Sequence, residues 1–109
     1  MKPWDVYQWK FPHGDHPAVI VCPAARCDNP QIDTVNVVGC SSKQARRSPG
    51  IHELVLDQAD GLDWPSLCRC DVLYLARKEE LTNKRGSLTQ ERRRMLGQKI
   101  VRLFGLLSQ

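Results

Sequence analysis

The sequence lacks any long apolar run. None of its apolar stretches approaches the roughly 20 residues that a membrane-spanning helix needs, and residues 1–5 contain no apolar stretch of signal-peptide length. We therefore expect a cytoplasmic protein with no membrane partner. The chain also lacks internal repeats and low-complexity segments. We expect its 109 residues to form a single domain, residues 1–109, with a modest core.

The sequence also lacks cysteine pairs at the spacing of a zinc site. Its five cysteines form a C-x4-C pair (Cys22, Cys27), a single residue (Cys40) and a C-x-C pair (Cys68, Cys70). Zinc sites typically use C-x2-C pairs or Cys/His sets. Apart from Cys27, these residues lie in apolar, strand-like context, where a free thiol behaves as a small hydrophobe. We expect reduced core cysteines rather than a metal site or disulfides, and no cofactor.

Net positive charge is absent from the first two thirds of the chain and is concentrated in the last third. Residues 1–76 carry seven Lys/Arg against nine Asp/Glu, whereas residues 77–109 carry nine Lys/Arg against three Glu. This basic segment is suited to nucleic acid or to an acidic protein partner. A solvated helix face explains the same charge, and the charge alone favours that interpretation.

The hydrophobic pattern predicts five short strands followed by a helix. The strands are expected at residues 4–11, 17–23, 34–41, 51–56 and 67–76, with turns at 27–30 and 83–86, a loop at 42–50 and a helical turn at 78–81. In the first strand, Trp4 and Val6 fall on one side, and Tyr7 and Trp9 on the other. The pattern favours a small, curled antiparallel sheet or barrel with a helix packed on it.

A C-terminal helix is predicted over residues 90–107. Thr89 is a good N-cap and Glu91 suits the first turn. The apolar residues on one stripe are spaced by four, three and four positions: Leu96, Ile100, Leu103 and Leu107. We expect this stripe to pack against the sheet.

A polar residue precedes the most apolar strand of the chain. His16 stands before Pro17, which suits the first residue of a strand because it has no N–H to donate. The run that follows is β-branched and apolar, as in a buried strand. His16 is therefore expected at the mouth of the strand, where a substrate can reach it.

Several segments, in order and spacing, resemble the PemK/MazF family of toxins from bacterial toxin–antitoxin systems. They cover nearly the whole chain: KPWDVYQWKF at 2–11, GDHPAVIV at 14–21, VVGCSSK at 37–43, SLCRCDVL at 66–73 and RGSLTQE at 85–91. The resemblance implies an SH3-like antiparallel barrel with a C-terminal helix. It also implies a homodimer that cleaves single-stranded RNA without a metal and is neutralised by a small acidic antitoxin.

The resemblance further implies which residues act on RNA. The family has an Arg before the Pro of strand 2 and a Thr or Ser at the end of strand 3; here these positions hold His16 and Ser41. Serine keeps the hydroxyl. Histidine loses the permanent charge and fork of Arg but gains the ability to act as a general acid or base. In strand 5, Val72 stands where the family commonly has Gln.

A basic loop after strand 3 adjoins these two positions in the family fold. Its residues Ser42, Lys43, Arg46 and Arg47 are candidates for holding RNA phosphates, and a solvated loop is the alternative. Trp9 and Trp64 can stack a base, although packing in the core or at a dimer interface is the favoured interpretation for both.

Two functional hypotheses follow. The first is a metal-independent endoribonuclease toxin. The second is a catalytically degenerate module of the same fold that binds an antitoxin or nucleic acid. In either case the family resemblance implies a homodimer, and we expect it to pair near strand 1, through exposed Trp4 and Trp9 on an edge strand, and near the loop after strand 3.

Overall fold

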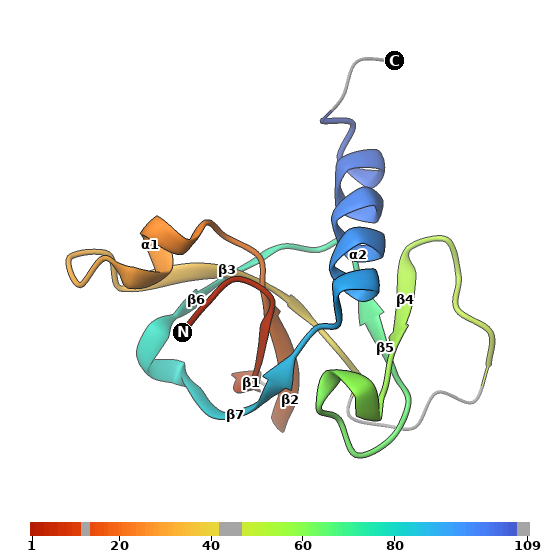
Figure 1. Ribbon diagram of the computed structural model, residues 1–109, viewed down its shortest axis with the longest axis horizontal. Coiled ribbons are helices and arrows are strands. Elements are labelled where there is room, and N and C mark those ends of the chain that lie inside the picture. The colour runs from red at the N-terminus through yellow and green to blue at the C-terminus, as the bar shows by residue number, and fades with distance from the viewer. Residues whose placement is uncertain (12–13, 42–46, 107–109) are drawn as a thin grey trace.

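The computed structural model describes residues 1–11, 14–41 and 47–106. Two short 3-10 turns, η1 (Gln58–Asp60) and η2 (Lys78–Glu80), separate strands in the second half of the chain. The main elements, in chain order, are β1 (Asp5–Phe11), β2 (Gly14–Ile20), α1 (Ala24–Asp28), β3 (Thr34–Gly39), β4 (Glu53–Leu56), β5 (Ser66–Arg69), β6 (Tyr74–Arg77), β7 (Leu81–Ser87) and α2 (Gln90–Leu103). The mainly antiparallel β fold with a C-terminal helix is confirmed (Figure 1).

The strands form two antiparallel sheets. The larger has the order β6-β3-β2-β1-β7, and β4 pairs with β5 in the smaller. The sheets meet just beyond β3, where Cys40 pairs with Cys68 and the Ser41 N–H donates to the Leu67 carbonyl over 2.8 Å. Among the described residues the strands make these two sheets rather than the closed ring of an ideal barrel.

Each face of the larger sheet covers its own core. On one face Val6, Val19 and Val38 pack with residues from β4, β5 and α2, including fully buried Leu96. The other face buries Trp9 and Ile20 in a second cluster. This division follows the period of two along a strand, so the predicted alternation of β1 is confirmed.

The helix α2 stands between the larger sheet and the β4–β5 pair (Figure 1). Its N-cap is Thr89, as predicted, with the hydroxyl accepting from the Arg92 N–H. Leu96 is fully buried, and Ile100 and Leu103 pack against the same core. The helix ends at Leu103, short of the predicted 107, and Leu107 lies outside the described residues.

A buried carboxylate fixes where α2 begins. Asp60 is fully buried in η1 and accepts from the N–H groups of Asp57 and Thr89. Arg92 reaches back from the first turn of α2 and lies 3.4 Å from an Asp60 oxygen. The same guanidinium donates to the Val55 carbonyl in the segment before η1 and pairs with Asp57 at 3.1 Å.

Other sequence predictions of local structure are also wrong. The expected turn at 83–86 lies inside β7, which pairs with β1. The expected strand at 67–76 is broken into β5 and β6. The expected turn at 27–30 begins inside the short helix α1.

The error at β7 has a clear physical reason. A Cβ placed on Gly86 would lie 2.8 Å from the Asp60 carbonyl oxygen, and one on Gly61 would lie 2.3 Å from the Arg85 carbonyl oxygen. Gly61 also has a φ of +97°, which disfavours any other residue. Gly86 therefore serves a close approach of two backbones, whereas the sequence pattern suggested a turn.

All five cysteines are buried with free thiols, as expected of core residues: Cys22, Cys27, Cys40, Cys68 and Cys70. The Sγ atoms of Cys22 and Cys27 are 3.5 Å apart. Burial, reinforced by the Cys22 thiol, raises the pKa of Cys27 to about 11. Hydrogen bonds with Cys40 and Cys70 raise the pKa of Cys68. These two thiols are therefore protonated near neutral pH and act as apolar side chains.

The predicted exposure of Trp9 on an edge strand is wrong. β1 lies inside the sheet, between β2 and β7, and Trp9 is 7 % exposed. Trp4 precedes the strand and packs, half-buried, against the core. In the described parts of the chain, no helix is long and apolar enough to cross a membrane.

Candidate active site at the ends of strands β2 and β3

His16 and Ser41 lie at the same end of the β2–β3 ladder. The β2–β3 ladder pairs Ala18 with Gly39, and the Cys40 N–H donates to the Pro17 carbonyl over 2.9 Å. The antiparallel register then places His16 opposite Ser41 as the next pair outward. The two residues that the family resemblance singled out are thus brought to one place on the sheet.

The surroundings of these two residues differ. The Ser41 backbone is held by its bond to Leu67, and the side chain is exposed. His16 is half-buried, and its Nδ1 atom is inaccessible to solvent. Both therefore have a fixed backbone at the border between core and surface, a setting that suits positioned acid–base and hydroxyl groups.

Pro17 is not the first residue of its strand, contrary to the sequence prediction. β2 begins at Gly14, so His16 belongs to the strand and pairs with Trp9 of β1. Proline has no N–H to donate, but its carbonyl can still accept a hydrogen bond. The sheet tolerates Pro17 because its bond to the β3 side is of this kind, with the Cys40 N–H as the donor. As a strand residue, His16 is placed more rigidly than a loop residue would be.

An aromatic pair flanks His16. Trp9, its partner in β1, contacts Tyr74 of β6 edge-to-face, with ring centroids 5.3 Å apart and planes at 61°. Trp9 is buried, which confirms packing as its role, and Tyr74 is 38 % exposed. Tyr74 carries no signal of its own in the sequence, because residues 67–76 were expected to form one continuous strand. Trp64, the other tryptophan considered for stacking, is 39 % exposed in the connection before β5.

Arg47 is the one member of the predicted basic loop that the structure describes; Ser42, Lys43 and Arg46 lie outside the described residues. Its guanidinium forms a two-pronged pair with Glu53, with both N···O distances at 2.7 Å. This hydrogen bonding, with a further bond from the Gly50 N–H, lowers the pKa of Glu53 to about 2. Arg47 would have to exchange this carboxylate for a phosphate to hold RNA.

A second arginine–carboxylate pair lies beside the first. Arg69 of β5 pairs with Glu53 of β4 across the two strands. Its guanidinium donates two hydrogen bonds of 2.8 Å to the Asp71 carboxylate. The pairing lowers the pKa of Asp71. The outer surface of the β4–β5 pair therefore carries alternating, mutually satisfied charges.

Much of the basic charge in residues 77–109 is used inside the molecule. Lys78 donates to the carbonyls of Arg26 and Asn29. Other cations in this segment bind carboxylates or carbonyls: Lys84, Arg85, Arg92, Arg93 and Lys99. The interpretation as a solvated helix face holds for exposed Arg94 and Arg102 and fails for Arg92.

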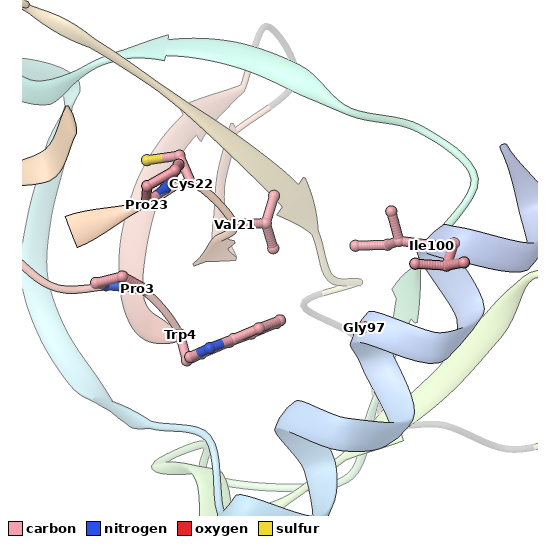
Figure 2. A pocket seen from close by; sticks show the side chains of 8 residues that line it. Pro3, Trp4, Val21, Cys22, Pro23, Gly97 and Ile100 are labelled. Carbon is pink, nitrogen blue, oxygen red and sulfur yellow. The ribbon is translucent and has the colours of Figure 1, made fainter. Parts of the chain in front are cut away.

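A separate pocket lies beyond the other end of β2. It has a volume of about 390 Å³ and lies between the N-terminal segment, the residues that link β2 to α1, and α2 (Figure 2). Its lining is apolar and consists of Pro3, Trp4, Val21, Cys22, Pro23, Gly97, Ile100 and Val101. With no acid or base in its wall, this pocket fits an apolar group and is not suited to catalysing hydrolysis.

No family model matches the sequence, and no curated protein matches it. Solved structures do match over nearly the full length of both chains. An endoribonuclease in complex with its cognate antitoxin, from a mycobacterial species, has a TM-score of 0.84 at 20 % identity and covers 100 % of this chain and 99 % of its own. The Mycobacterium tuberculosis toxin MazF-mt6 has a TM-score of 0.79 at 19 % identity, over 95 % of this chain and 99 % of its own.

A third match comes from another bacterium. A MazE–MazF complex from Deinococcus radiodurans has a TM-score of 0.76 at 16 % identity, with 96 % of this chain and 95 % of that chain covered. At such identities the likeness is one of fold. The chain has the fold of MazF toxins, as the sequence resemblance implied.

Proposed function

We propose that this protein is an endoribonuclease toxin that cleaves single-stranded RNA without a metal ion and is neutralised by an antitoxin. One observation supports the proposal: the register of β2 and β3, continued outward past the Ala18–Gly39 pair, sets His16 opposite Ser41, on a fold similar to that of an endoribonuclease. The two residues are 25 positions apart in the sequence and carry the two kinds of group that the reaction needs.

The proposed reaction is an internal transfer at the phosphate. The ribose 2′-oxygen loses its proton to a base and attacks the adjacent phosphorus, while the bond from phosphorus to the 5′-oxygen breaks. The leaving 5′-oxygen takes up a proton, so the products are a 2′,3′-cyclic phosphate and a 5′-hydroxyl. His16 supplies acid–base catalysis, and the Ser41 hydroxyl donates to a phosphate oxygen as charge develops there.

The basic loop supplies phosphate contacts in this proposal. Ser42, Lys43, Arg46 and Arg47 hold the RNA backbone beside the reacting group. The Arg47 side chain is 63 % exposed, so its guanidinium can reach a phosphate when it leaves Glu53. A phosphate offers the same two-pronged geometry.

The partner that restrains the enzyme is proposed to be a small acidic antitoxin. Two of the matched structures are complexes with an antitoxin, from a mycobacterial species and from D. radiodurans. The net charge of +4 on this chain favours an acidic partner.

The second candidate is a binding module of the same fold without catalysis. Two observations favour it: histidine replaces the permanently charged arginine of the family pattern at position 16, and Arg47 is already paired with Glu53. Such a module would bind an antitoxin or RNA and cleave nothing.

Incubation of the purified protein with single-stranded RNA, with and without EDTA, separates the two candidates. The toxin proposal expects cleavage that EDTA does not reduce and products that end in a 2′,3′-cyclic phosphate. RNA that remains intact while the protein still binds it, or binds an acidic partner, would establish the binding module instead. Cleavage abolished by EDTA would contradict the metal-independent chemistry.

A further inference from the structure

Tyr74 lies on the same face of the larger sheet as His16. Residues directly opposite in antiparallel strands share a face, and so do residues two apart in one strand. Tyr74 pairs with Val37, Val37 pairs with Ile20, and Ile20 shares its face with Ala18 and His16. Tyr74 and His16 therefore lie on one face of the sheet, the face that also buries Trp9 and Ile20, although they are 58 positions apart in the sequence.

Small residues separate the two side chains. Ala18 and Gly39 form the pair between His16 and the Ile20–Val37 pair. Neither carries a side chain large enough to fill the space above the sheet. Trp9 is the β1 partner of His16, and its ring meets that of Tyr74 with centroids 5.3 Å apart.

The two aromatic side chains differ in their exposure to solvent. Trp9 is 7 % exposed, so its ring is committed to the core and to the contact with Tyr74. Tyr74 is 38 % exposed and belongs to β6, the edge strand of the sheet. An edge-to-face contact of this kind holds the outer ring in position.

We propose that Tyr74 stacks on a nucleobase of the bound RNA next to the phosphate held at His16 and Ser41, with Trp9 keeping the ring in place. The inference rests on the proposed function, since it names a base-binding subsite of the same site. Every nucleobase has a π-face, so stacking adds affinity with little selection by base edges. Tyr74 is thus a binding residue for RNA and takes no part in the proton transfers.

A non-cleavable RNA tests the inference. We would use single-stranded oligonucleotides that carry 2′-O-methyl groups and a single 2-aminopurine, moved one position at a time along the strand. Binding of the wild-type protein is expected to quench one position through stacking. Tyr74→Phe keeps the ring and should retain the quenching, whereas Tyr74→Leu should lose it.

Affinity and turnover are measured on the same variants. Base stacking of the usual strength predicts that Tyr74→Leu weakens RNA binding by about 5- to 100-fold, with KM rising and kcat nearly unchanged. Leu75→Ala is the matched control, because Leu75 is 63 % exposed on the same strand and pairs with Asn36 on the opposite face. The thermal unfolding temperature of each variant is also measured. Similar values for the wild type and Tyr74→Leu would show that a loss of RNA binding does not come from a destabilised fold.

The outcomes separate the subsite from the function. If Tyr74→Leu binds RNA as tightly as the wild type with the same quenching, or if Tyr74→Phe loses as much as Tyr74→Leu, the stacking role is wrong even when cleavage is intact. If the protein binds RNA through Tyr74 and cleaves nothing, the stacking role of Tyr74 holds and the proposed endoribonuclease activity is wrong. Loss of antitoxin binding alone in Tyr74→Leu would assign Tyr74 to a protein interface and overturn the inference, as would a wild-type protein that binds no RNA.

Discussion

Individual residues at the proposed site combine a rigid backbone with groups that can act on a phosphate. His16 and Ser41 are each tied into the sheet through their neighbours, by the bonds from Cys40 to Pro17 and from Ser41 to Leu67. Such a scaffold keeps reacting groups in place without an ordering cost at the moment of reaction. The charged residues nearby are instead satisfied in pairs, with Arg47 on Glu53 as the clearest case.

The Arg47–Glu53 pair should make stability depend on acid pH. The pKa of Glu53 is about 2 in the folded chain, against an ordinary value of 4.5. The stabilisation is complete above pH 4.5 and is lost as the pH falls toward 2, because the unfolded chain then binds the proton more readily. Glu53→Gln should therefore show a shallower loss of stability between pH 4.5 and 2 in urea titrations than the wild type.

A surface carboxylate provides the control for that measurement. Glu79 lies 3.6 Å from Arg77 and is 76 % exposed at its side chain. Glu79→Gln should leave the acid dependence of the wild type unchanged. Equal slopes for Glu53→Gln and the wild type would show that the pair contributes nothing in solution.

Removal of the Ser41 hydroxyl should lower RNA cleavage and leave the fold unchanged. The side chain is exposed, and Ser41 is held in the sheet by its backbone N–H, which alanine keeps. A transition-state hydrogen bond of this type is worth about 10²–10³ in kcat. The comparison is with Ser48→Ala, an exposed serine outside the site. A Ser41→Ala protein that cleaves as fast as Ser48→Ala would remove Ser41 from the mechanism.

At the scale of elements, α2 and η1 act as one unit. At the N-terminus of α2, the Thr89 N–H donates a hydrogen bond to the Asp60 carboxylate. Arg92, in the first turn of α2, forms ion pairs with the carboxylates of Asp57 and Asp60. The helix also closes the core beneath β4 and β5 through Leu96. Basic side chains that suggested a nucleic-acid surface thus include some that hold the helix in place.

Truncation of the central helix contact should destabilise the fold. Leu96→Ala removes a fully buried side chain and should lower the free energy of unfolding by about 2–5 kcal/mol in urea denaturation. Met95→Ala changes the neighbouring position, which is 38 % exposed, and should have a much smaller effect. Similar losses in both variants would contradict the observed packing of α2.

The elements with strong local signals were the predictable ones. Thr89 and the stripe through Leu96 placed α2, and the apolar alternation placed β1 and β3. β7 could not be predicted, because its Gly86 serves a close approach to η1 that depends on residues 25 positions away. The His16–Ser41 pair came from the family resemblance, and Tyr74 became visible only through its ring contact with Trp9.

In the described residues, the molecule has a curled five-stranded sheet, a two-stranded sheet and the helices α1 and α2, of which α2 stands between the two sheets. We propose that two such chains form a homodimer, although not through an edge at β1, since that strand lies inside the sheet. Large apolar residues remain exposed at the C-terminal end of α2, namely Phe104 and Leu106. Exposed apolar residues of this kind are characteristic of contact surfaces.

Light scattering tests the dimer. The account expects a mass twice the 12.4 kDa of one chain. A single-chain mass that persists at high protein concentration would contradict it.

The central claim is that His16 performs acid–base chemistry on RNA. The most direct measurement is the RNA cleavage rate of His16→Ala beside that of His52→Ala, which removes an exposed histidine outside the site. We expect His16→Ala to be slower than the wild type by about 10²–10⁴-fold, the usual range for losing an acid–base group, and His52→Ala to match the wild type. If His16→Ala cleaves RNA as fast as His52→Ala, the assignment of His16 is wrong.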